Sequence, residues 1–171
     1  MLRDFCAASW EKCAGVRAPK EQRVPEWDHE VIDEDGNTVW EEAVLDVVTS
    51  DPATGHALHL DVTVTTACPA DLAALHQRAR RDGRGAADAA ADKRRRYRLA
   101  GASLVPVAFE DGGRPAEETI AFVRRCGAAA DRRETLGSED GGQPVVARLW
   151  QGLSTLLQWG NADMILNANG G

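Results

Sequence analysis

Two aspartates lie in stretches that are otherwise apolar and rich in β-branched residues. Asp46 stands in Ala-Val-Leu-Asp-Val-Val, and Asp61 stands in His-Leu-Asp-Val-Thr-Val. A carboxylate is disfavoured inside an apolar β-strand, so two of them favour a chemical role over the alternative, strand-end acids that face solvent. Paired carboxylates are suitable ligands for a hard cation such as Mg²⁺, which prefers oxygen and keeps several waters.

The residues between these aspartates predict that the two side chains lie side by side. The turn sequence Asp51-Pro-Ala-Thr-Gly55 closes a hairpin between a strand over 43–49 and a return strand. In the return strand Asp61 shares a face with His59, which we interpret as a sheet-surface residue rather than a ligand. The hairpin register can bring Asp46 and Asp61 together, and a slip of one residue would separate them.

Lys93 and Tyr97 follow on a helix expected over 86–99, where they share one face with Ala90. A lysine beside a metal-bound water can orient that water or neutralise charge that develops on a phosphate. The alternative is that Lys93 is one of several surface cations. The surrounding arginines are either phosphate contacts or a solvated helix face, and the candidates for phosphate contact are Arg84, Arg94, Arg95 and Arg96.

In this order the residues resemble a known family. Asp46, Asp61-Val-Thr-Val, Lys93-Arg-Arg-Arg-Tyr97 and Val105-Pro-Val-Ala-Phe-Glu110 look like the restriction-enzyme-like endonuclease domain of LINE-type retrotransposons. Those domains belong to the PD-(D/E)XK nuclease superfamily. The resemblance covers roughly residues 20–125, and the segment 153–166 adds to it. It implies a C-terminal fragment of a retroelement reverse transcriptase polyprotein.

The resemblance also implies a fold and an activity. The fold class would be α/β (α+β), with a restriction-endonuclease-like mixed sheet flanked by helices in the order α-β-β-β-α-β and extra C-terminal helices. The activity would be a Mg²⁺- or Mn²⁺-dependent endonuclease that nicks target DNA. The alternative is a catalytically inactive nuclease-fold remnant that binds nucleic acid or protein.

Residue roles follow from the same resemblance. Asp46 and Asp61 would hold the metal, Lys93 would be the catalytic lysine, and Tyr97 would be its partner. Glu21 is a third candidate carboxylate. The chain departs from the family pattern at Leu45, where the family name has Pro, and at Thr63, where the short form of the motif has Lys.

We expect a nuclease-like domain over 1–126, a linker over 127–144, an amphipathic helix over 145–166 and a disordered tail over 167–171. The helix is expected to pack back on the domain, with self-association or a partner contact as the alternative. Within the domain, a turn at 33–37 joins strand 27–33 to strand 38–49, which predicts a contact between Trp27 and Trp40. Pro106 indicates that strand 103–109 lies towards a sheet edge.

Composition limits the partners of this chain. A formal net charge of −7 argues against general nucleic-acid affinity, but the positive charge gathers in residues 76–98, so DNA stays a candidate partner. No apolar run approaches the length of a membrane span, and the N-terminus is too polar for a signal peptide. We therefore expect an intracellular protein, nuclear if it acts on genomic DNA. The four cysteines show no metal-binding spacing and are expected to be reduced thiols.

Overall fold

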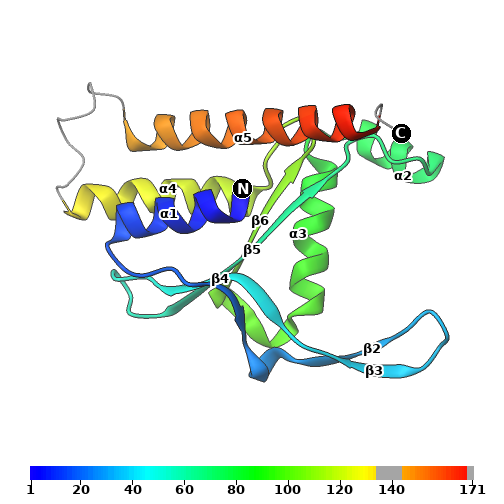
Figure 1. The fold of residues 1–171 in the computed structure, drawn as a ribbon, viewed down its shortest axis with the longest axis horizontal. Coiled ribbons are helices and arrows are strands. Elements are labelled where there is room, and N and C mark those ends of the chain that lie inside the picture. The colour runs from blue at the N-terminus through cyan, green and yellow to red at the C-terminus, as the bar shows by residue number, and fades with distance from the viewer. Residues whose placement is uncertain (134–143, 169–171) are drawn as a thin grey trace.

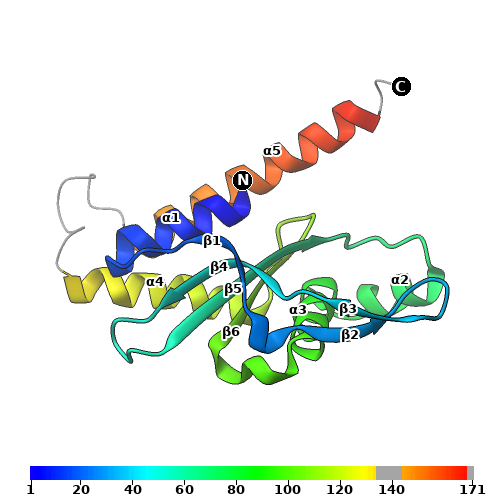
Figure 2. The same cartoon turned by 60° about the horizontal axis from the view of Figure 1, so that its bottom comes forward.

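The structure, a computed structural model, describes residues 1–133 and 144–168. It is a mixed α/β arrangement in which helices cover both faces of a central sheet (Figures 1 and 2). The helices are α1 (Leu2–Ala14), α2 (Leu72–Ala79), α3 (Arg84–Arg96), α4 (Glu117–Arg133) and α5 (Val145–Ala168), with short 3₁₀ turns η1 (Pro25–Trp27) and η2 (Arg98–Ser103). The strands are β1 (Lys20–Arg23), β2 (His29–Ile32), β3 (Thr38–Glu41), β4 (Val44–Ser50), β5 (Ala57–Thr65) and β6 (Leu104–Glu110).

The central sheet has the strand order β1-β4-β5-β6. Its first two pairings are antiparallel, and β5 pairs with β6 in parallel, which requires the crossover made by α2 and α3. β2 and β3 form a separate antiparallel hairpin. The predicted mixed α/β class is therefore confirmed: an N-terminal helix, a four-stranded mixed sheet, a separate hairpin and several helices.

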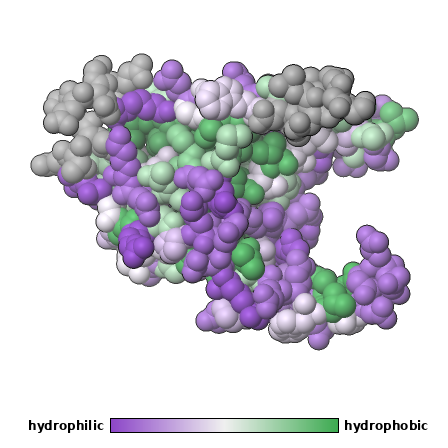
Figure 3. Space-filling view, viewed as in Figure 1, coloured by the Kyte–Doolittle hydropathy of each residue, from purple (hydrophilic) through white to green (hydrophobic). Residues whose placement is uncertain are grey.

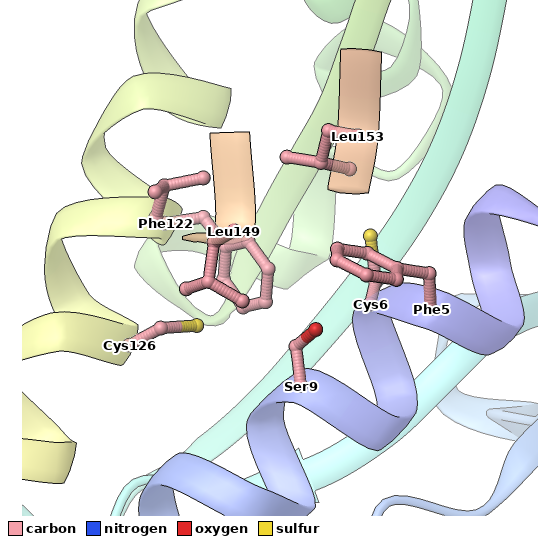
Figure 4. Close-up of a pocket in the computed structure, with 8 residues that line it drawn as sticks. Phe5, Cys6, Ser9, Phe122, Cys126, Leu149 and Leu153 are labelled. Atoms are coloured by element: carbon pink, nitrogen blue, oxygen red, sulfur yellow. The ribbon is translucent and has the colours of Figure 1, made fainter. Parts of the chain in front are cut away.

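One face of the sheet packs against α1 and α4, and α5 lies over both helices. Buried Trp10 and Phe122 meet Val47, Leu60 and Val107 of the sheet in one cluster that also includes Leu153 and Leu157 of α5. Figure 4 shows a small apolar cavity where these three helices meet. This cavity lies on the face opposite Asp61, because Leu60 and Asp61 point to opposite sides of β5.

The other face packs against α3. Ala86 and Ala90 of this helix contact Ala108 of β6, and such small side chains allow a close approach of helix and sheet. Glu110 at the end of β6 accepts a hydrogen bond from the backbone N–H of Gly85, at 2.8 Å, and so holds the first turn of α3. The helix ends at Arg96, three residues earlier than predicted, with Tyr97 as its C-cap.

The expected long strand over 38–49 is broken into β3 and β4. Residue 43 leaves the ladder because its N–H donates to the Asp28 carboxylate at 2.7 Å, while its carbonyl accepts from Val24 N–H at 2.8 Å. The predicted contact between Trp27 and Trp40 is wrong. Trp27 lies in η1 and is buried, whereas Trp40 lies opposite Glu30 in the hairpin and is exposed.

The prediction that Pro106 belongs to an edge strand is confirmed, since β6 ends the sheet. The open side of β6 is covered by α4, because the hydroxyl of Thr119 donates to the carbonyl of Ala108 and accepts from its N–H. In this way an edge that could pair with another chain is protected.

The linker predicted from residue 127 is wrong at its start, because α4 continues to Arg133. Gly127 lies inside the helix, where an added Cβ would come within 2.6 Å of Val146 Cγ2, so this glycine permits the close approach of α5. The rest of the expected linker, 134–143, lies outside the described residues. α5 packs back on α1 and α4 as expected and runs to Ala168, so the predicted tail begins too early, and 169–171 lie outside the described residues.

All four cysteines are free thiols: Cys6, Cys13 and Cys126 are buried, and Cys68 is exposed. Within the described ranges, no helix combines the length and the apolar character that crossing a bilayer requires.

Candidate active site

Asp61 is a buried acid that faces α3. The residue is only 5% exposed, and Lys93 Nζ lies 3.0 Å from its Oδ2 atom. The contact is an ion pair without good hydrogen-bond angles, and Oδ2 has no hydrogen-bond partner among the described residues. The Lys93 side chain is 23% exposed. The structure thus brings Asp61 and Lys93 together, as predicted from the sequence.

The electrostatics of Asp61 are set by its burial. Loss of solvent raises the pKa of this carboxyl above its ordinary value, and the nearby Lys93 charge opposes that rise without cancelling it. The negative charge of Asp46 adds a smaller upward contribution. A buried acid with a raised pKa beside a cation is a feature typical of functional sites.

Asp46 lies beside Asp61 in the strand register. The β4–β5 pairing runs as far as Val47 opposite Leu60, and one further step places Asp46 opposite Asp61. At this point the Asp46 Oδ2 atom accepts a hydrogen bond from Val62 N–H at 2.6 Å, in place of a main-chain acceptor. The carboxylate therefore bridges the two strands where their ladder ends, which is a structural role as well as a chemical one.

Glu21 continues the same row, because the β1–β4 register places it opposite Asp46. It is 66% exposed and pairs with Arg3 of α1, and its φ of 52° is in the left-handed region. The Arg3 Nε atom is buried and has no hydrogen-bond partner in the described chain. The register places the Glu21 backbone opposite Asp46, but the Glu21 carboxylate forms an ion pair with Arg3 of α1.

Tyr97 lies in an aromatic cluster beside the site. Its ring centroid is 6.0 Å from that of Trp27 and 5.9 Å from that of His29. Burial, followed by the negative charge of Asp61, raises the pKa of Tyr97, so it is a neutral phenol at neutral pH. Tyr97 lies near Asp61, as the sequence predicts, but its contacts there are mainly packing contacts with aromatic rings.

His59 is the residue near the site whose environment the sequence did not predict. It is buried, its ring centroid is 4.4 Å from that of Trp27, and burial lowers its pKa. Its Nδ1 atom has no hydrogen-bond partner among the described residues. The strand alternation predicts that His59 and Asp61 share a face of the sheet. The burial of His59 under Trp27 was not predicted, because it depends on the position of η1.

The four candidate phosphate contacts do not form one strip. Successive helical positions point about 100° apart, so the arginines of α3 point to different sides. Each also has an acidic partner: Arg84 pairs with Asp88, Arg94 with Glu118, Arg95 with Asp92, and Arg96 with Glu41. Of the four, Arg96 is the one whose positive charge acts on Asp61, lowering its pKa slightly.

The donor set fits a hard cation better than a transition metal. No group of three or more His, Cys, Asp or Glu side chains among the described residues is placed to hold a metal ion. Mg²⁺ is commonly bound through one or two carboxylates, with waters and substrate phosphates completing its shell. Asp46 and Asp61 fit that pattern, because the Asp61 Oδ2 atom lies beside Lys93 Nζ but accepts no hydrogen bond from the described residues.

Comparisons of the chain with models of protein families, with curated proteins and with solved structures find no match. The resemblance to retrotransposon endonucleases therefore depends on the residues and their arrangement alone.

Proposed function

We propose that this chain is a metal-dependent DNA endonuclease of restriction-endonuclease-like fold and retrotransposon origin, which nicks its target by phosphodiester hydrolysis. The observation that carries the proposal is the contact between buried Asp61 and Lys93, directly beside Asp46 in the sheet. The two acids come from β4 and β5, and the lysine comes from α3, where the resemblance implies a lysine shifted from the strand to the following helix. The crossover from β5 to β6 supports the same proposal.

Mg²⁺ or Mn²⁺ bound at Asp46 and Asp61 would lower the pKa of a water and stabilise negative charge on the scissile phosphate. Lys93 neutralises Asp61 while no cation is bound, which makes the burial of this carboxylate tolerable. With a cation bound at Asp61, the ammonium of Lys93 would be able to donate to the attacking water or to a phosphate oxygen. Tyr97 and Trp27 keep the end of α3 in place.

A second candidate function is non-catalytic binding of nucleic acid or protein by an inactive nuclease fold. One observation favours it: both aspartates already have partners inside the chain, Asp46 in Val62 N–H and Asp61 in Lys93. The acids would then hold the sheet and α3 together without any cation.

Plasmid nicking in Mg²⁺ or Mn²⁺ tests the first function. We expect Asp61→Asn and Lys93→Met each to lower the nicking rate by roughly 100-fold or more, since each removes charge stabilisation in the transition state. Matched controls are Asp88→Asn, an acid of α3 that pairs with Arg84, and Lys12→Met, a lysine of α1. Equal rates for Asp61→Asn and Asp88→Asn would remove the assignment of the site.

Calorimetric titration with Mn²⁺ separates the two functions without an activity assay. Binding that is lost in Asp46→Asn and in Asp61→Asn, but kept in Asp88→Asn, supports the metal site. A chain that binds duplex DNA with a steep salt dependence, but neither takes up Mn²⁺ nor cuts, fits the second function instead.

A further inference from the structure

The β2–β3 hairpin projects from the body of the molecule (Figures 1 and 2). The two strands pair with each other and make no extended contact with another described element. At its base, Glu41 pairs with Arg96 of α3. An isolated two-stranded hairpin is marginal in water, so contact with a further surface would stabilise it.

Large apolar side chains are exposed on one face of this hairpin. The cross-strand pairs are Glu30 with Trp40 and Ile32 with Thr38, so Trp40 and Ile32 lie on the same face. Their exposed fractions are 63% and 76%. An exposed Trp next to an exposed Ile on a projecting hairpin is typical of an interaction site.

The charge of the hairpin selects the kind of partner. Residues 28–42, which we call the acidic arm, contain seven Asp or Glu and no Lys or Arg. Four of these acids form no ion pair within the part of the chain that the structure describes: Glu30, Asp33, Glu34 and Asp35. The acids near the base pair with Arg23 and Arg96. A concentration of negative charge repels nucleic acid, so a binding partner of the acidic arm needs a positively charged surface.

Such a surface exists on this same chain. Residues 72–84, which we call the basic ledge, contain α2 and the turn into α3, and carry four arginines against Asp82, itself paired with Arg114. Arg80 and Arg81 are exposed and form no ion pair among the described residues. Leu72, at the start of α2, is 69% exposed and supplies an apolar contact.

The acidic arm and the basic ledge lie on either side of a hollow in the surface. Figure 3 shows this hollow at the right of the molecule, between α2 and the hairpin. The two sides carry opposite charge, and each has an exposed aliphatic side chain. A surface that contains both a protrusion and its complement is suited to an isologous contact, in which each copy uses both parts once and the assembly closes as a dimer.

We propose that two copies of this chain pair in this way, with the acidic arm of each lying against the basic ledge of the other. Glu30 and Glu34 meet Arg80 and Arg81 of the second copy, and the exposed face of Trp40 covers its Leu72. The proposal does not depend on nuclease activity.

The first test is the molar mass of the full chain, measured by light scattering and sedimentation at low and high salt. We expect a dimer at low salt that dissociates as salt rises, because screening weakens charge pairs at a surface. Glu30→Lys/Glu34→Lys and Arg80→Glu/Arg81→Glu should each be monomeric at concentrations where the wild type is a dimer. Asp131→Lys, which reverses an exposed charge near the C-terminal end of α4, should stay dimeric.

Mixing the two reversed variants is the decisive experiment. A lysine arm then meets a glutamate ledge, and an acidic arm meets an arginine ledge, so we expect a heterodimer from two proteins that are monomers alone. Circular dichroism checks that each variant is folded. A wild type that is monomeric under all conditions overturns the proposal, even if its arm binds added polylysine. A dimer that survives both reversals also overturns it, since another surface, such as α5, would then hold the copies together.

Discussion

Asp61 reduces the stability of the fold when it is ionised, because its burial raises its pKa. The unfolded carboxyl titrates near 3.8, so above that pH the unfolded chain has released a proton that the folded chain still holds. The free energy of unfolding therefore falls as the pH rises from about 3.8 to the higher pKa of the folded state. Above that pKa the loss is complete and constant.

At the residue scale we accordingly predict that Asp61→Asn gains stability relative to the wild type as the pH rises from about 4 to 7. Asparagine does not titrate, so it avoids the cost of a buried charge. Urea unfolding at a series of pH values measures the difference. In Lys93→Met the free energy of unfolding should continue to fall to a higher pH than in the wild type, because the cation that opposes the rise of the Asp61 pKa is gone. Parallel pH curves for the wild type and the Asp61→Asn variant would contradict the prediction.

Asp46 and Asp61 were predictable because their placement depends on short-range rules, whereas the contact of Lys93 with Asp61 depends on how α3 packs on the sheet. A turn of known type fixes the hairpin register, and the alternation of strands fixes the face. The environment of His59 was not predictable, because it depends on Trp27, which is far away in sequence and reaches the sheet through η1. The pairing of Glu21 with Arg3 likewise depends on where α1 lies.

Helix α3 is the element that positions Lys93, and Glu110 anchors its first turn. We predict that Glu110→Ala lowers the free energy of unfolding by about 1–2 kcal/mol, because a buried N–H at a helix start loses its acceptor. It should also lower nicking, since α3 sets the distance from Lys93 to Asp61. Asp71→Ala is the matched control: Asp71 caps α2, which carries no site residue, through Ala74 N–H. This control should cost stability and leave the nicking rate of the folded protein unchanged.

Elements with one strong local signal were predicted well, and those controlled by distant contacts were not. Gly15 ends α1 with a left-handed φ of 71°, as its position in the sequence indicates. Gly85 looks like a helix breaker, yet it lies inside α3. An added Cβ there would come within 3.0 Å of Glu110 Oε1, so the glycine permits the close approach of Glu110. The extension of α4 past Gly127 has the same kind of cause, a close approach of another element.

The contact between α4 and α5 joins the C-terminal helix to the rest of the molecule. We predict that Gly127→Ala destabilises the chain by about 1–3 kcal/mol, because Val146 is β-branched and stiff in a helix and does not easily move aside. Gly160→Ala in α5 is the control; nothing lies within 4 Å of its added Cβ, so better helix propensity should stabilise by up to about 1 kcal/mol. Thermal unfolding measures both. Recovery of stability in Gly127→Ala/Val146→Ala would identify the clash as the cause, and no recovery would contradict it.

The acidic arm and the basic ledge carry opposite charge, so this part of the molecule has a local electric dipole in addition to the net charge of −7 of the whole chain. A net charge acts on the rate at which a charged body approaches, whereas a dipole exerts a torque on the approaching molecule. Near a polyanion we expect this local dipole to favour an approach with the α2 side inward and the hairpin outward. Orientation of this kind reduces the number of unproductive encounters, even for a protein whose total charge is of the repelling sign.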